Sequence, residues 1–148
     1  MTAFIYSAAG LKLTKSFEGC ELTAYVDQGG VWSIGYGHTG MYVREGMTIT
    51  QAEADALLSL DVAFAVKCVN KLVTANIRQN QFDALVDFVF NLGCSRLANS
   101  QLLLDVNAGK FFEAAAQFLR WDHVGKVVMP GLARRRRAEA AMFYKAVE

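Results

Sequence analysis

A glycine-rich stretch from Phe17 to Gly40 restricts the fold more than any other part of this chain, because it interrupts spacing that is otherwise helical. Its glycines exclude a continuous helix and stand at positions 29, 30, 35 and 37. Apolar residues on either side of the first two glycines have the spacing of short strands, namely Leu22, Ala24, Val26, Val31 and Ile34. The stretch therefore predicts a small hairpin-like sheet that directly follows a helix.

Helical signals flank this sheet. Ser7 is a suitable N-cap for a helix from about Ala8 to Phe17, which would place Glu18 at the helix end. On the other side of the glycines, Met41 to Met47 predicts a weak strand followed by a loop. A helix end would fix the position of Glu18 better than a free loop could.

The remainder of the chain predicts further helices. Thr50 and Glu53 have the spacing of a capping box, and the helix that they begin should run to about Leu72. Its two apolar stripes are wider than a surface helix needs, which suits a connection between two lobes. Later helices are expected at about 77–92, 101–107, 111–120 and 131–146, and the last begins after Pro130.

Composition sets the outer bounds of the fold and of the location. A chain of 148 residues fits one domain or two small lobes, and 53% hydrophobic content is enough for a core. The net charge of +1 gives no overall attraction to nucleic acid or membrane. No basic leader is visible, and no segment approaches the roughly 18 apolar residues of a membrane span. Work outside the cytoplasm would need a separate means of release or a leader that this sequence has lost.

The three cysteines give no metal signature. Cys20, Cys68 and Cys94 lack CxxC spacing and cannot all pair with one another. We interpret them as small buried hydrophobic residues, and we expect neither a zinc site nor a disulfide framework.

Glu18 and Asp27 are the first candidates for chemistry. Cleavage of a glycosidic bond needs one protonated carboxyl that donates to the leaving oxygen and one carboxylate that activates water or stabilises the sugar cation. Two acids on neighbouring elements meet that need, with the hydroxyl of Ser33 close by in sequence. Their spacing alone is also compatible with two solvated surface acids.

Two other features favour structural interpretations. His38 has no HExxH motif around it, so we expect it to hold a turn through a hydrogen bond. Four arginines at positions 134–137 resemble a nucleic-acid patch, but consecutive helical residues point about 100° apart and cannot share one face. At least one must point inward and pair with a carboxylate or carbonyl. Nucleic-acid binding is therefore disfavoured.

The motifs together resemble one known family. FEG at 17–19 is followed by eight residues between Glu18 and Asp27, five residues before Ser33, and IGYGHTG at 34–40. This pattern is similar to the active-site stretch of phage lysozymes, the endolysins of tailed phages. Further segments are similar in the same order, namely NQFDALVDFVFNLG at 80–93, RWDH at 120–123 and PGLARRRRAEAAMF at 130–143. The resemblance covers nearly the whole chain.

The resemblance implies an α+β fold, mainly α, of the lysozyme-like two-lobed kind. A single catalytic domain would occupy residues 1–148, with an N-terminal lobe at about 8–50 that carries a small β-sheet. A long connecting helix would follow at about 51–72, and a helical C-terminal lobe at about 73–148.

The resemblance also implies a reaction. It is the inverting hydrolysis of the β-1,4 bond between N-acetylmuramic acid and N-acetylglucosamine in bacterial peptidoglycan, for which we expect no cofactor and no metal. Glu18 would be the general acid, and Asp27 and Ser33 would flank the attacking water. The family usually has threonine where this chain has Ser33. Serine keeps the hydroxyl but lacks the methyl group that restricts χ1, so we expect reduced or normal activity.

Other roles carry over from the family. Asn91 matches a cleft-lining amide that would bind an acetamido group of the sugar. His38 and Asp61 resemble a structural ion pair between the sheet lobe and the long helix. Arg135 is expected to be the inward arginine near Glu18.

The same resemblance implies the setting in which the chain works. A monomeric endolysin without a stable membrane anchor would accumulate in the host cytoplasm and act on the wall in the periplasm, after a separate holin-type membrane protein opens the way. Two alternatives stay open. A lytic transglycosylase also uses a glutamate but leaves an anhydro-muramic end, and a non-catalytic peptidoglycan-binding module would keep only the fold.

Overall fold

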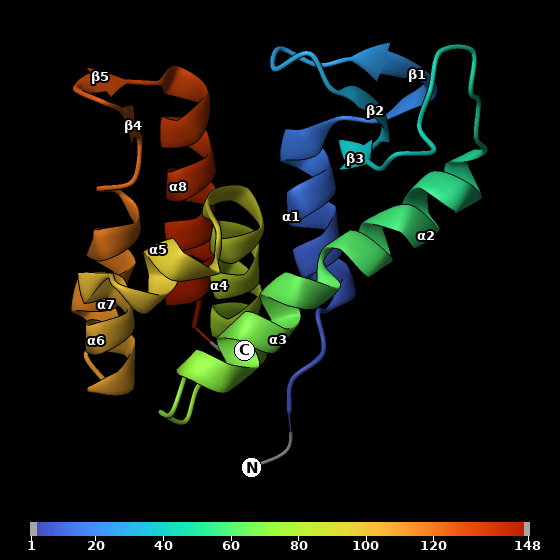
Figure 1. Ribbon diagram of the computed structural model, residues 1–148. Helices are drawn as coiled ribbons and strands as arrows, with labels where there is room; N and C mark the ends of the chain where they lie inside the picture. Colours follow the sequence, from blue (N-terminus) through green and yellow to red (C-terminus); the bar gives the residue numbers. More distant parts are fainter. Residues whose placement is uncertain (1–2, 147–148) are drawn as a thin grey trace. The chain divides into compact units, whose positions relative to one another are not determined.

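A computed structural model describes residues 3–146 of the chain and confirms the predicted fold class, mainly α with a small antiparallel sheet (Figure 1). The chain divides into two compact units. The smaller unit is Thr14–Ala63, and the larger unit combines the residues before Thr14 with those after Ala63. The larger unit is therefore discontinuous in sequence.

The sheet of the smaller unit lies in the glycine-rich stretch, as predicted. Its strands are β1 (Glu21–Val26), β2 (Trp32–Gly35) and β3 (His38–Thr39), in that order and antiparallel. One face covers a small core that contains Ile34, Val43, Ile49 and Ala54. The weak strand predicted within Met41–Met47 is wrong, because turns occupy that segment, with hydrogen bonds from Val43 N to Gly40 O and from Met47 N to Arg44 O.

Residues next to its two ends determine where helix α1 (Ala8–Glu18) begins and ends. The hydroxyl of Ser7 accepts a hydrogen bond from the Gly10 amide at 3.2 Å, which confirms the predicted N-cap. At the other end, Gly19 has a φ of 65°, a left-handed conformation that ends a helix. Glu18 is therefore the last residue of α1.

The long helix predicted from Thr50 to Leu72 is two helices, α2 (Gln51–Asp61) and α3 (Ala63–Leu72). The predicted capping box is present at the start of α2. The two helices, and not the two predicted apolar stripes, divide between two cores, since Leu60 and Phe64 of one stripe are exposed. Ala54 on α2 packs in the smaller unit, whereas three residues of α3 pack in the larger one, namely Ala65, Cys68 and Val69. The helix is interrupted at Val62, where ψ is −11°. This residue separates the part of the chain that packs in one core from the part that packs in the other.

Helix α4 (Gln79–Leu92) is the centre of the larger unit. Every residue from Gln81 to Val89 is buried, so α4 is a core helix that is covered on all sides. Helices α5 (Cys94–Ala98), α6 (Gln101–Asn107), α7 (Phe111–Phe118) and α8 (Pro130–Tyr144) complete this unit. Helix α8 packs against both α4 and α7.

Two short elements were not predicted from sequence. One is α5, and the other is a hairpin of β4 (His123–Val124) and β5 (Val127–Val128), whose turn includes Gly125 with a φ of 59°. Both are too short to produce a periodic signal. Among residues 3–146, no helix has the length and apolar character needed to cross a membrane.

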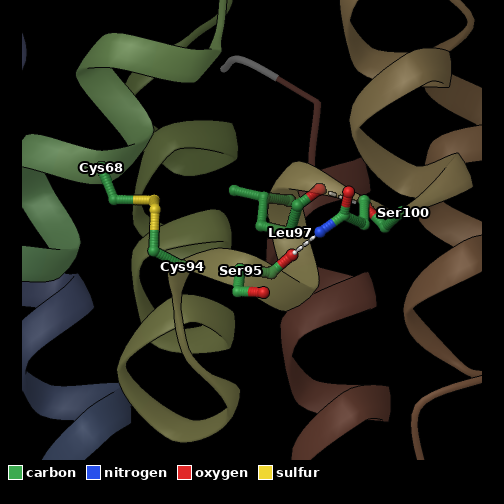
Figure 2. Close-up of a disulfide and its surroundings, with 6 residues drawn as sticks. Cys68, Cys94, Ser95, Leu97 and Ser100 are labelled. Carbon is green, nitrogen blue, oxygen red and sulfur yellow. Dashed lines mark hydrogen bonds between the residues drawn. A yellow bond between two sulfur atoms is a disulfide. The ribbon is translucent and has the colours of Figure 1, made fainter.

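The structure corrects our expectation for two of the three cysteines. Cys68 on α3 and Cys94 at the start of α5 form a disulfide, and their Cα atoms are 6.0 Å apart (Figure 2). Gly93 ends α4 and turns the chain back, which brings Cys94 to α3. A separation of 26 residues carries no recognisable sequence signature. Cys20 keeps a free thiol and is half-buried.

Reduction of this disulfide should destabilise the protein. A cross-link that closes a loop of this size restricts the unfolded chain, so its loss should lower the free energy of unfolding by about 2–4 kcal/mol. Urea denaturation of the oxidised protein, of the reduced protein and of a Cys68→Ala/Cys94→Ala variant measures the difference. Cys20→Ala is the matched control and should keep its sensitivity to reductant. An unfolding midpoint that reductant leaves unchanged would contradict the disulfide.

Candidate active site

Asp27 is held by the turn that follows β1. The Gly30 amide donates to the Asp27 carbonyl at 3.0 Å, and Gly30 has a φ of 80°, which suits glycine. Oδ1 of Asp27 accepts hydrogen bonds from the amides of Gly29 at 2.8 Å and Val31 at 2.9 Å. An aspartate that accepts from the amide two residues ahead is typical of such turns. These two amides thus orient the carboxylate through Oδ1, and Oδ2 accepts from neither of them.

The hydroxyl of Ser33 lies beside that second oxygen. Ser33 is on β2, opposite Tyr25 of β1, and is 2% exposed. Its Oγ is 3.3 Å from Oδ2 of Asp27 and 3.2 Å from the carbonyl oxygen of Val31. A hydroxyl has one hydrogen, so it donates to one of these oxygens at a time. The predicted pair of Asp27 and Ser33 is therefore within hydrogen-bond distance.

Glu18 lies next to the glycines that end the same stretch. A Cβ placed on Gly37 would lie 3.9 Å from Oε2 of Glu18, and Gly37 has a φ of 80°. A larger residue at position 37 would thus be strained by its backbone conformation. The sequence IGYGHTG therefore places a glycine in contact distance of the Glu18 carboxylate.

Tyr25 shows that the acids share one electrostatic environment. Burial raises the pKa of the Tyr25 phenol, and the negative charges of Asp27, Glu21 and Glu18 raise it further. All three carboxylates are therefore close enough to affect the same side chain. The candidate acids Glu18 and Asp27 are brought together within the smaller unit.

His38 and Asp61 lie within hydrogen-bond distance in the same unit. Nδ1 of His38 is 2.8 Å from Oδ2 of Asp61, on the last residue of α2. Nε2 of His38 forms a hydrogen bond with the hydroxyl of Tyr42, a partner that we did not predict. The ring of Tyr42 also lies over Gly40, where a Cβ would be only 2.8 Å from Tyr42 Cε1. These contacts hold strand β3 against α2.

The larger unit contains a buried cluster of charged groups. Arg135 donates from Nε and Nη2 to the two oxygens of Asp87, at 2.9 and 2.8 Å. Arg136 donates from Nη2 to Oδ1 of Asn91 at 2.9 Å and to Oε2 of Glu139 at 2.8 Å. Both arginines and both carboxylates are at most 6% exposed. Burial raises the pKa of the Glu139 carboxyl, Asp87 adds to that rise, and Arg136 opposes it.

The arginine run faces two ways. Arg135 and Arg136 are buried, whereas Arg134 and Arg137 are exposed. The sequence predicted an inward Arg135 but not a second inward arginine. Arg135 and Glu18 belong to different units, and their predicted proximity stays a prediction.

No cluster of metal ligands is found within residues 3–146, where no three histidine, cysteine, aspartate or glutamate side chains are arranged to hold an ion. The candidate site presents two carboxylates and a hydroxyl, from the end of α1, from the turn after β1 and from β2. This geometry leads to comparison with known proteins.

Residues 15–139 match the sequence profile of the family described as phage lysozyme. The chain belongs to this family. The match includes all of the candidate residues, from Glu18 to Arg135.

Relatives within the family are similar over most of this chain. The endolysin of Bacillus phage B103 is 43% identical over 139 residues, which cover 93% of this chain and 53% of that protein. The chain thus spans about half the length of this relative. The endolysin of Acyrthosiphon pisum secondary endosymbiont phage 1 is 40% identical, with 95% of this chain and 98% of that protein covered. The solved muramidase domain of SpmX from Asticaccaulis excentricus has a TM-score of 0.88 and 42% identity, over 96% of this chain and 99% of that domain.

Sequence reasoning missed Asp87 and Glu139. Asp87 interrupts an apolar run on α4, between Val86 and Phe88, and an acid at such a position must find a partner when it is buried. That signal, together with the arginine run, would have been enough to pair Asp87 with an inward arginine.

Loss of the Asp87 charge should destabilise the larger unit. Asp87→Asn keeps the shape of the side chain but removes the charge that balances Arg135, so the free energy of unfolding should fall by about 3–5 kcal/mol. Chemical denaturation measures the change, with the exposed Glu113→Gln on α7 as the control. A variant as stable as the unaltered chain would contradict the importance of this ion pair.

Proposed function

We propose that this chain is an endolysin that hydrolyses the β-1,4 bond between N-acetylmuramic acid and N-acetylglucosamine in bacterial peptidoglycan. The observation that carries the proposal is the convergence of Asp27 and Ser33 in the unit that also presents Glu18. Membership of the phage lysozyme family supports the same reaction. The muramidase named in the structural comparison also supports it.

Glu18 acts as the general acid in this proposal. The glycosidic oxygen leaves as an alcohol, so it needs a proton as the bond to the sugar carbon breaks. The end of α1 fixes the Glu18 backbone, and Gly37 lies beside its carboxyl group. The acid must hold a proton before the reaction, so that it can donate this proton to the leaving oxygen.

Asp27 and Ser33 position the attacking water. Two backbone amides fix one oxygen of Asp27, and its second oxygen and the Ser33 hydroxyl are 3.3 Å apart. A water molecule that donates to both oxygens would be oriented toward the sugar carbon on the face opposite the leaving group. Attack from that face inverts the configuration and forms no covalent intermediate.

The other candidate residues have supporting roles. Asn91 binds an acetamido group of the sugar, and its amide is held by Arg136. Arg135 is the inward arginine, and Asp87 holds its guanidinium. His38 and Asp61 maintain the sheet that carries Ser33.

The proposal also includes the setting. The chain works as a monomer, accumulates in the host cytoplasm and reaches the wall in the periplasm after a separate holin-type membrane protein opens the way. The SAR-endolysin of Enterobacteria phage P21, 34% identical over 122 residues, supports action on the cell wall.

Glu18→Gln should lose most activity and remain folded. Glutamine has the shape of glutamate but no proton to donate, so cleavage of purified peptidoglycan should fall by about 100- to 10,000-fold. Mass spectrometry of the digest, together with a reducing-end assay, measures cleavage. Glu21→Gln is the matched control, because it removes a neighbouring exposed acid and should change the rate little.

The chemical nature of the new ends decides between mechanisms. Reducing muramic-acid ends that depend on Glu18 support hydrolysis. Anhydro-muramic ends would contradict it in favour of a transglycosylase, and binding without cleavage by the unaltered chain would indicate a binding module. Unchanged cleavage by Glu18→Gln would reject the acid role.

Changes at Ser33 test the water-positioning role. Ser33→Thr keeps the hydroxyl and restricts its rotation, so activity should equal or exceed that of the unaltered chain. Ser33→Ala removes one hydrogen bond to the water, and the rate should fall by about two- to tenfold. Thermal unfolding of each variant controls for packing at this buried position. A Ser33→Thr variant that folds normally but is far less active would refute the proposed role.

A further inference from the structure

The hairpin of β4 and β5 exposes apolar side chains that the proposed reaction does not use. Val124 and Val127 are each 62% exposed, Val128 is 51% exposed, and Met129 is 41% exposed. Val124 pairs with Val127 across the hairpin, so their side chains are neighbours on one face. Of the residues that the structure describes, the hydrophobic core of the larger unit includes none of these four.

Positive charge surrounds this hairpin. Lys126 is exposed in its turn, and Arg120 is exposed shortly before β4. Helix α8 begins directly after the hairpin (Figure 1), and its exposed arginines Arg134 and Arg137 lie three residues apart on one side of the helix. Nη2 of Arg134 would be 3.8 Å from a Cβ on Gly131, in the first turn of α8, so this guanidinium extends back toward the hairpin.

One carboxylate lies next to the hairpin. Asp122, which precedes β4, contacts Nδ1 of His123, a ring that is charged only when it is protonated. The combination is therefore a small apolar projection with cations around it. Side chains of this kind are typical of proteins that bind an anionic membrane surface, where apolar groups enter the headgroup layer and cations contact lipid phosphates.

We propose that the β4–β5 hairpin, together with Lys126, Arg134 and Arg137, docks the chain on an anionic lipid bilayer. The cationic side chains and the apolar side chains both contribute to binding at such a surface. A polar polyanion such as a wall polymer would use the cations but would leave the valines exposed to water. The valines therefore favour lipid as the partner. The proposal does not depend on the hydrolysis of peptidoglycan.

Vesicle co-sedimentation of the full chain tests this surface. Large vesicles of equal parts phosphatidylcholine and phosphatidylglycerol should bind the chain more tightly than vesicles of phosphatidylcholine alone. Arg134→Gln/Arg137→Gln should weaken binding about fivefold for each charge removed. The control Lys67→Gln/Lys71→Gln makes the same charge change at exposed positions on α3 and should bind normally.

The valines are tested separately. Val124→Ser/Val127→Ser should weaken binding at least about fivefold without changing the net charge. Leu104→Ser is the control, since Leu104 is 64% exposed on α6 and lies outside the proposed surface. As a second measurement, a fluorescent label on Val127→Cys in a Cys20→Ser background should be quenched by spin-labelled lipid.

Three results would overturn the proposal. The first is the absence of binding to anionic vesicles. The second is binding that the arginine variants weaken but the valine variant does not, together with an unquenched label, because this pattern indicates a purely electrostatic surface for a polyanion. The third is equal weakening by the α3 control, which would indicate a general charge effect. Tight binding that both hairpin and arginine variants weaken, with quenching at position 127, supports membrane docking.

Discussion

Two carboxylates on the buried helix α4 determine much of the arrangement of the larger unit. A charge in the interior is tolerated only when it is paired or fully hydrogen-bonded, so Asp83 and Asp87 each require partners. Asp83 accepts from the amide of Ser7 and from the side chain of Gln79. Asp87 accepts from both nitrogens that Arg135 presents. These bonds attach the N-terminal segment and helix α8 to the same core helix.

The smaller unit uses a different device. Its chemistry depends on a five-residue turn in which backbone amides hold the carboxylate of Asp27. Such a turn needs no large core, which suits a unit whose buried apolar cluster is small. Strand β2 carries Ser33, and the end of α1 carries Glu18. Regular elements therefore position these two side chains, and the paired strands β1 and β2 position the turn between them.

Local chemistry was predictable from sequence, and long-range pairing was not. Ser7 at the start of α1 and Thr50 at the start of α2 act within one helical turn, so each could be identified from its neighbours. The disulfide of Cys68 and Cys94 depends on how α4 returns the chain, and the interruption at Val62 depends on which core each helix meets. The residues themselves made Glu18 and Asp27 candidates, with Ser33 close by, and the family resemblance added Asn91 and the role of each residue. It did not supply Arg136 and Glu139, whose mutual contact follows from their places on α8.

The discontinuity of the larger unit has a consequence for biosynthesis. The smaller unit is encoded by one continuous segment, so a ribosome completes it while most of the larger unit has not been made. The bond between Ser7 and Asp83 joins residues 76 positions apart. The segment before Thr14 must therefore wait, with its partners in α4 still unsynthesised, until α4 emerges. A chain built in this way completes its larger unit late, after the smaller unit has been made.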